Sequence, residues 1–271
     1  MSAFEAIVLG LVQGLTEFLP ISSTGHIRIV SAFFGWDDPG AAFTAVIQLG
    51  TMAAVLVYFR RDLWHIARSW VAELRLPFRE RSRDANLGWF IILGTIPVAV
   101  LGLAFNNQIE SGARSLTLIG SALIVFSFVM LYAERVATRD RSLDELDGRD
   151  GLFIGVAQAL ALIPGVSRSG ATISAGLLRG FDRESAARYS FLLSVPAVVL
   201  SGLFELRHIG EKGGAPVGAT VIATLLSFVV GYAAIAWLLR YLASHTLGVF
   251  VVYRIALGVI VLALVAAGAI S

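Results

Sequence analysis

Two short polar segments interrupt an otherwise apolar chain, and their residue types suit the binding of an anion. The first covers residues 17–26 and the second covers 164–172, and each contains Pro and Gly after an apolar run. Hydrocarbon penalises ionisable groups and irregular backbone, so both segments are expected to line a cavity inside the protein. Together they supply a carboxylate, hydroxyls, an imidazole and a guanidinium. The sequence therefore predicts a membrane-embedded anion site, most simply for a phosphate.

The chemistry expected of each side chain follows from its type. Arg168 can hold two phosphate oxygens through its planar fork, and it stays charged at any working pH. Glu17 is expected to act as a general base or a metal ligand, and a structural ion pair with Arg168 is the alternative. His26 is a candidate nucleophile or general acid. Ser23 is a second candidate nucleophile, although Ser before a helix more commonly serves as its cap.

Hydroxyls and backbone N–H groups around these residues are expected to bind the phosphate oxygens. The short helix after Gly170 would direct the positive end of its dipole toward the anion. Outside the two segments, Arg254 is interpreted as a side chain that extends toward the membrane interface, and Gln48 is not assigned to the site. Besides Arg168, the expected phosphate-binding residues are Ser22, Thr24, Gly25, Ser167, Ser169, Gly170 and Thr172.

The composition places the chain in the membrane. Of its 271 residues 57% are hydrophobic and only 15% are charged, whereas a soluble domain carries about 25% charged residues. Six apolar runs are close to the roughly 17–25 residues that span a bilayer. There is no Cys, which excludes disulfides and thiolate chemistry, and the net charge of +2 gives no reason to expect nucleic acid.

An internal repeat organises the chain as a single integral membrane domain, 1–271. An offset of 145 residues aligns the two polar segments without a gap. The regions around them lack a run long enough to span, so each is predicted to form a re-entrant helical hairpin rather than a Pro-kinked span. The predicted fold is an all-α polytopic membrane protein with an inverted repeat of one hairpin plus three transmembrane helices, six full spans in total. The first repeat, 1–134, has the hairpin 3–34 and the spans 41–59, 87–105 and 115–133, and the second, 151–271, has the hairpin 151–178 and the spans 189–206, 217–239 and 249–270.

Arginine placement predicts which side of the membrane each loop faces. One group of arginines lies between the first two full spans, and a second group lies in the loop two spans later. Loops two spans apart lie on the same side, which the positive-inside rule makes the cytoplasm. The first group is Arg60, Arg61, Arg68, Arg75, Arg79, Arg81 and Arg83, and the second is Arg135, Arg139, Arg141 and Arg149.

The two segments also resemble the signatures of a known family. Residues 13–26, QGLTEFLPISSTGH, resemble the first signature of the undecaprenyl-diphosphate phosphatase family of the bacitracin-resistance type, and residues 164–172, PGVSRSGAT, resemble its second. The resemblance implies an enzyme of the bacterial plasma membrane that removes the terminal phosphate of undecaprenyl diphosphate. Its product is the lipid carrier of cell-wall synthesis, and its active site faces the outer side. Catalytic roles are thereby expected for Glu17, Ser23, His26 and Arg168.

The resemblance further implies a divalent cation, Mg or Ca. Many relatives have Glu where this chain has Gln13, and an amide oxygen is a weaker ligand than a carboxylate. Glu17 is therefore the expected metal ligand, with Gln13 beside it. A metal site built from two carboxylates of the first segment is not expected.

Several alternatives stay open at the level of sequence. Inverted repeats and re-entrant hairpins are also transporter architecture, so a transporter or flippase for a phosphorylated polyprenyl lipid is the alternative to hydrolysis. The attacking group is Ser23, His26 or water. The expected partners are a long-chain polyprenyl diphosphate and membrane lipids, with no nucleic acid, and a homodimer is left open.

Overall fold

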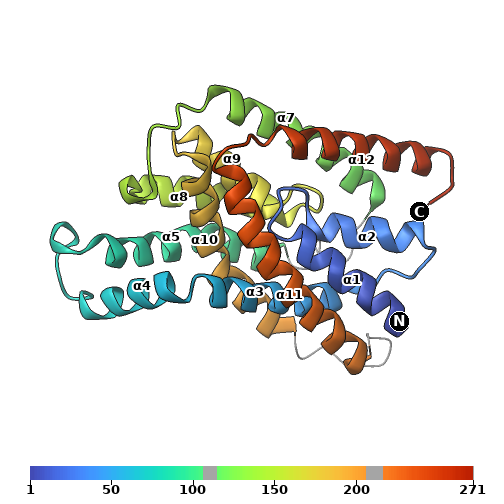
Figure 1. Ribbon diagram of the computed structural model, residues 1–271, viewed down its shortest axis with the longest axis horizontal. Coiled ribbons are helices and arrows are strands. Elements are labelled where there is room, and N and C mark those ends of the chain that lie inside the picture. The colour runs from blue at the N-terminus through green and yellow to red at the C-terminus, as the bar shows by residue number, and fades with distance from the viewer. Residues whose placement is uncertain (106–114, 206–215, 271) are drawn as a thin grey trace.

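The computed structural model describes residues 1–105, 115–205 and 216–270 (Figure 1). Within these ranges the chain is helical and contains no β-strand beyond one isolated bridge between Arg141 and Phe181. Short 3-10 turns at 78–80, 143–145 and 160–162 join some of the helices. The helices are α1 (Ala3–Thr16), α2 (Ser23–Phe33), α3 (Gly40–Tyr58), α4 (Arg60–Ala72), α5 (Arg83–Ala104), α7 (Leu116–Val136), α8 (Gly148–Ala159), α9 (Arg168–Leu178), α10 (Arg183–Glu205), α11 (Val217–Leu242) and α12 (Gly248–Ala266).

Several helices have the length and composition of membrane spans. In the described part of the chain, α5, α7, α11 and α12 are long and apolar enough to cross a bilayer. The number rises from four to five if α3 and α4, which meet at an angle of 78°, are taken as one span. The all-helical, multi-pass membrane class is thus confirmed. Helices α3 and α10 include residues 41–58 and 189–205 of the predicted spans 41–59 and 189–206, and residue 206 lies outside the described residues.

A helix cap and ion pairs explain where the helix boundaries differ from the apolar runs. Helix α10 begins at Arg183, before the predicted start at 189. Asp182 caps it by accepting the N–H of Ser185 at 2.8 Å, and its charged first turns have partners on other elements. Arg183 pairs with Glu134 of α7, and Arg188 pairs with Asp62 of α4 at 3.2 Å. Helix α4 forms inside the Arg-rich segment after the first span, where it packs against α5.

The two polar segments lie at the tips of two short helical hairpins. Helices α1 and α2 have 14 and 11 residues, or about 21 and 17 Å, too short to cross a hydrocarbon core of roughly 30 Å. The open ends of this hairpin meet where the Phe4 and Trp36 rings lie 6.0 Å apart. Helices α8 and α9 form the second hairpin, whose open ends meet where Arg179 donates to Asp150 at 2.5 Å. Each hairpin therefore returns to the end from which it entered.

The helix boundaries of the two hairpins repeat with the offset of 145 residues. Helices α2 and α9 span 23–33 and 168–178. Each is capped by a Ser with a positive φ, 75° at Ser22 and 77° at Ser167, and each Ser accepts the N–H three residues on. Such φ values are strained for a residue other than Gly and persist only where the surroundings enforce them. The same backbone turn is thus built twice.

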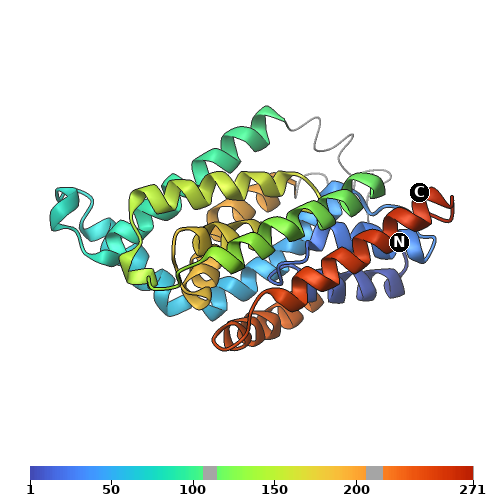
Figure 2. The same cartoon turned by 90° about the horizontal axis from the view of Figure 1, so that it is seen from above.

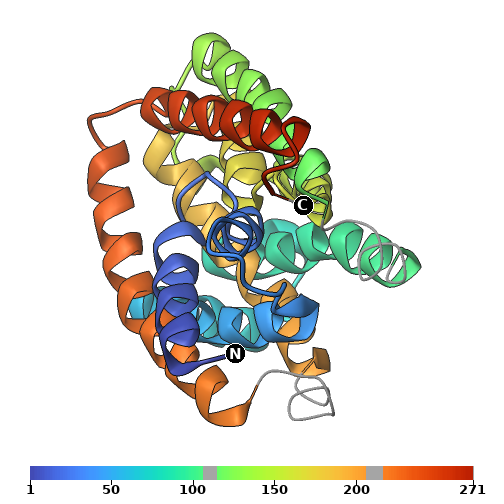
Figure 3. The same cartoon turned by 90° about the vertical axis from the view of Figure 1, so that its right-hand side faces the viewer.

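Long helices surround the hairpins and place their tips near the middle of the molecule. Helix α1 packs on α11, and α8 packs in the corresponding way on α5. Helices α7 and α12 lie side by side (Figures 1 and 2). Viewed from the end that carries both termini, the tip of the α1–α2 hairpin lies centrally (Figure 3). The arginine-rich segments 60–86 and 135–149 lie at the opposite end from the termini (Figure 1).

Candidate active site

The two hairpin tips contact each other directly. The hydroxyl of Ser22 accepts the backbone N–H of Gly165 at 3.2 Å. The hydroxyl of Ser169 donates to the Leu19 carbonyl at 3.0 Å. Both polar segments therefore belong to one site, although they are far apart in the sequence.

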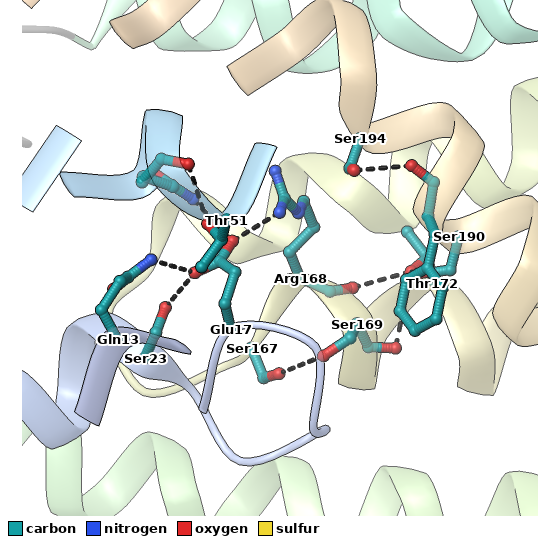
Figure 4. A network of polar contacts seen from close by, with 12 residues as sticks. Gln13, Glu17, Ser23, Thr51, Ser167, Arg168, Ser169, Thr172, Ser190 and Ser194 are labelled. Carbon is teal, nitrogen blue, oxygen red and sulfur yellow. Dashed lines mark hydrogen bonds and ion pairs between the residues drawn. The ribbon is translucent and has the colours of Figure 1, made fainter. Parts of the chain in front are cut away.

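Glu17 lies at the centre of a hydrogen-bond network (Figure 4). One carboxylate oxygen accepts from Gln13 Nε2 at 2.9 Å and from Ser23 Oγ at 2.5 Å. The other accepts from Gln48 Nε2 at 2.7 Å and from Arg168 Nη2 at 2.5 Å. An ionised carboxylate accepts about four hydrogen bonds, so the four donors satisfy it fully. Its side chain is only 3% exposed, and this arrangement explains how a carboxylate is tolerated at that depth.

The Ser23–Glu17 contact has the geometry of a hydroxyl with its general base. Ser23 is the first residue of α2 and remains partly exposed. Because an ionised carboxylate only accepts, the hydroxyl proton of Ser23 points toward Glu17. A hydroxyl held in this way is poised to lose its proton as its oxygen attacks.

Arg168 keeps most of its hydrogen-bonding capacity. Its Nη2 donates to Glu17, and a guanidinium carries five N–H groups in all. The side chain is 16% exposed, so an anion could reach the remaining donors. Helix α9 is held behind it, where Thr172 Oγ1 donates to the Arg168 carbonyl at 2.8 Å and lies 2.6 Å from Ser190 Oγ (Figure 4).

The remaining residues predicted to bind phosphate lie around this centre, and several of their polar groups bond within the tips. The N–H groups of Gly25 and Gly170 donate to Ser22 and Ser167. The hydroxyl of Ser167 lies 3.1 Å from that of Ser169. Thr24, in the first turn of α2, is partly buried. Direct phosphate contacts by these groups stay a prediction.

His26 lies one turn after Ser23 and is held by two partners. Its Nδ1 is 2.8 Å from the Ser22 carbonyl, and its Nε2 is 2.7 Å from the Tyr253 hydroxyl. The imidazole is buried, and the Tyr253 ring stacks on it with centroids 5.6 Å apart. The imidazole is therefore fixed in orientation.

Arg254 is not at the membrane interface, and its interpretation as an interfacial side chain is wrong. It is 0% exposed. Its guanidinium donates to the Pro20 carbonyl at 3.1 Å and to the Gly165 carbonyl at 2.9 Å, and its Nε donates to Ser127 at 3.1 Å. Arg254 thus binds one carbonyl from each hairpin tip and holds the tips together.

Sequence reasoning missed three residues of this site: Gln48, Tyr253 and Arg254. A polar side chain inside an apolar span is costly unless it has a partner, and this cost is the signal that points to Gln48 and Arg254. For Tyr253 the sequence offers no comparable signal, because a half-exposed Tyr is ordinary in a membrane helix.

The donors near Glu17 fit a divalent cation that takes most of its ligands from a bound diphosphate. Gln13 Oε1 is buried and has no hydrogen-bond partner, so one amide oxygen is free beside the carboxylate. Within the described residues, no group of three or more Asp, Glu or His side chains converges as a metal site. Mg²⁺ is commonly held by one or two carboxylates together with substrate phosphates, and Glu17 would match that pattern after exchanging one of its four donors for the cation.

Comparisons with known proteins agree with the geometry. A family model described as "Bacitracin resistance protein BacA" matches residues 6–260. A protein named "Undecaprenyl-diphosphatase" from a Nocardioides species is 54% identical over 268 residues, which cover 98% of each chain. Proteins of the same name from Thermobifida fusca and Mycolicibacterium smegmatis are 54% and 53% identical, cover 100% of this chain, and are themselves covered to 93% and 99%. Because the match extends over nearly the whole chain, the protein belongs to the bacitracin-resistance family of undecaprenyl-diphosphate phosphatases.

Proposed function

We propose that the protein hydrolyses undecaprenyl diphosphate to undecaprenyl phosphate and inorganic phosphate. This reaction recycles the lipid carrier of cell-wall synthesis and confers resistance to bacitracin. The observation that carries the proposal is the position of the Glu17 carboxylate, which joins the Ser23 hydroxyl to the Arg168 guanidinium. A base, a nucleophile and a phosphate-binding cation are thereby assembled at one point.

In the proposed mechanism, Arg168 binds the terminal phosphate through its free N–H groups. Ser23 Oγ attacks the terminal phosphorus in line, and its proton passes to Glu17. The bond from that phosphorus to the bridging oxygen breaks, and undecaprenyl phosphate leaves with the bond electrons. Water then attacks the phosphoserine, which releases inorganic phosphate and restores the hydroxyl. Phosphoryl transfer depends mainly on positioning and charge stabilisation, which these residues supply.

A divalent cation, Mg or Ca, belongs to this proposal as a partner of the phosphates. The free Oε1 of Gln13 would be one protein ligand, and Glu17 would become the second by exchanging one of its four hydrogen-bond donors for the cation. When bound, such a cation would neutralise negative charge on the diphosphate. Turnover with and without a chelator tests this part of the proposal.

The membrane arrangement is proposed in the same terms. We infer that α3 and α10 cross the bilayer together with α5, α7, α11 and α12, which gives six spans. Two short hairpins that meet tip to tip, with their open ends directed apart, support an inverted repeat. The arginine-rich end would face the cytoplasm, and the site would open to the outer side. A homodimer stays a prediction that light scattering in detergent tests.

A flippase for phosphorylated polyprenyl lipid is not favoured. A transport site needs the anion-binding Arg168, but it has no need of a hydroxyl bonded to a carboxylate. The contact of Ser23 with Glu17 therefore argues for chemistry rather than for transport alone.

The test is phosphate release from undecaprenyl diphosphate by purified protein in detergent. Ser23→Ala should lower kcat about 100-fold or more, because it removes the attacking oxygen. Ser31→Ala is the matched control on the same helix, since its buried hydroxyl has no partner, and it should turn over like the wild type. Near-normal turnover by Ser23→Ala would reassign the attack to His26 or water. A folded wild type that binds the lipid without releasing phosphate would support the transporter.

A further inference from the structure

His26 is the site residue whose protonation the structure defines most closely. Its Nδ1 lies 2.8 Å from the carbonyl oxygen of Ser22. A carbonyl can only accept a hydrogen bond, so Nδ1 must carry a proton. In the neutral imidazole, the lone pair is then on Nε2.

The Tyr253 hydroxyl is the partner of that lone pair. It lies 2.7 Å from Nε2, which is the distance of a good hydrogen bond, and the two rings stack at an interplanar angle of 11°. Tyr253 therefore donates to Nε2 while His26 is neutral. If Nε2 gains a proton, the same hydroxyl can turn and accept, because a phenol is both donor and acceptor.

The chain fixes Tyr253 in place through the next residue. Arg254 follows it on α12 and is bonded to the carbonyls of Pro20 and Gly165 in the two hairpin tips. Helix α12 is thus held at a set position against α2. Tyr253 is itself 44% exposed, although its ring stacks on His26.

We infer that Tyr253 fixes the orientation of His26, whose Nδ1 proton is held by the Ser22 carbonyl, and directs Nε2 in both protonation states. The inference rests on the proposed hydrolysis for its kinetic part, where Nε2 exchanges a proton with the transferring phosphoryl group by way of the Tyr253 hydroxyl to which it is bonded. A group that acts by proton exchange must present one defined nitrogen to the reaction. Small errors in such positioning can cost up to about a hundredfold in rate.

The variant that isolates this role is Tyr253→Phe, which keeps the stacked ring and removes only the hydroxyl. Tyr232→Phe is the matched control, because Tyr232 is a half-exposed residue of α11 whose ring contacts Tyr58, at 5.5 Å, rather than His26. The first measurement is the side-chain ¹⁵N spectrum of the full chain in detergent, labelled at its 4 histidines and assigned with His26→Gln. The second is steady-state phosphate release.

In the wild type and in Tyr232→Phe, we expect His26 to show a protonated Nδ1 and an unprotonated Nε2 at neutral pH. In Tyr253→Phe, we expect Nδ1 to stay protonated because the Ser22 carbonyl remains, the ¹⁵N shift of Nε2 to move because Nε2 loses its hydrogen-bond donor, and kcat to fall by about tenfold to a hundredfold with an unchanged KM. A merely structural role for Tyr253 would lower stability without moving the ¹⁵N shifts of His26.

The inference is overturned if the wild type carries its proton on Nε2, or if Tyr253→Phe leaves both the ¹⁵N shifts and kcat unchanged. Failure of the proposed function looks different. In that case the wild type releases no phosphate, while the ¹⁵N shift of Nε2 still moves in Tyr253→Phe, and the positioning contact stands without the reaction.

Discussion

The guanidinium of Arg168 and the carboxylate of Glu17 form a buried ion pair at 2.5 Å, although they are 151 residues apart in the chain. One charge comes from each hairpin, so neither hairpin could bury its own charge without the other. The pair therefore couples assembly of the fold to assembly of the site. It also balances the charges of these two side chains before an anionic substrate arrives.

This coupling predicts that removal of one charge costs more than removal of both. Arg168→Gln should lower the free energy of unfolding by about 3–5 kcal/mol, because the Glu17 carboxylate is left buried without a cation. The double variant Glu17→Gln, Arg168→Gln should recover a large part of that loss. Thermal melting in detergent measures both effects, and phosphate release should be absent in both variants.

An additive result would contradict this prediction. If the double variant lost as much stability as the two single variants together, the two charges would not depend on each other in the folded state.

The contacts of Arg254 with both hairpin tips lead to a second prediction about the stability of the protein. Arg254→Met should lower the stability by about 2–5 kcal/mol, because the buried carbonyls of Pro20 and Gly165 lose their donor. Turnover should fall as well, since the tips are then free to separate. Arg240→Met, at an exposed position on α11, is the control and should melt like the wild type. Equal melting of the two variants would show that the guanidinium does not hold the tips.

The sequence was informative where a local pattern repeats. Capping serines and the offset of 145 residues locate α2 and α9, because an N-cap is decided by neighbouring residues. The first turns of α10 were missed because the prediction followed the apolar run and not the cap at Asp182, and because the partners of Arg183 and Arg188 lie far away in the sequence.

The site residues also divide into those that a local sequence pattern marks and those that only distant contacts bring to the site. Glu17, Ser23 and Arg168 stand out as polar residues in apolar surroundings, and the structure brings them within hydrogen-bonding distance. Tyr253 and Arg254 reach the tips only through the packing of α12, with contacts that span 227 and 234 residues. No local pattern encodes contacts of that range.

The contacts of Asp150 with Arg141 and Arg179, at the arginine-rich end, predict how the stability of the protein depends on pH. Asp150 is 0% exposed, and burial alone would raise its pKa. Hydrogen bonds from Arg141 and Arg179 outweigh that effect, so its pKa lies below the ordinary value of 3.8. A lowered carboxyl pKa contributes stability above the unfolded-state pKa, and this contribution is lost as the pH falls through the folded-state value.

The melting temperatures of the wild type and of Asp150→Asn should therefore differ most from neutral pH down to about pH 5. The difference should narrow as the pH falls below about 4. Asp37→Asn, at an exposed position, should follow the wild type throughout. A difference between wild type and Asp150→Asn that stays constant down to pH 3 would show that the charge of Asp150 is not what stabilises this end.

We predict that the second hairpin tip cannot accept a side chain at position 165, for two separable reasons. Its φ of +96° is unfavourable for any residue with a Cβ, and a Cβ there would lie 2.7 Å from the Ile119 carbonyl oxygen. Gly35 has a φ of +66° but open space around it, so Gly35→Ala carries the backbone strain alone, about 1–2 kcal/mol. Gly165→Ala should cost about 1–3 kcal/mol more, because the clash forces the tip away from α7.

Gly165→Ala should also reduce turnover, since the N–H of Gly165 bonds Ser22 and its carbonyl bonds Arg254. Equal losses of stability in the two variants, measured by melting in detergent, would mean that the tip has room to move and that its close packing does not position the site.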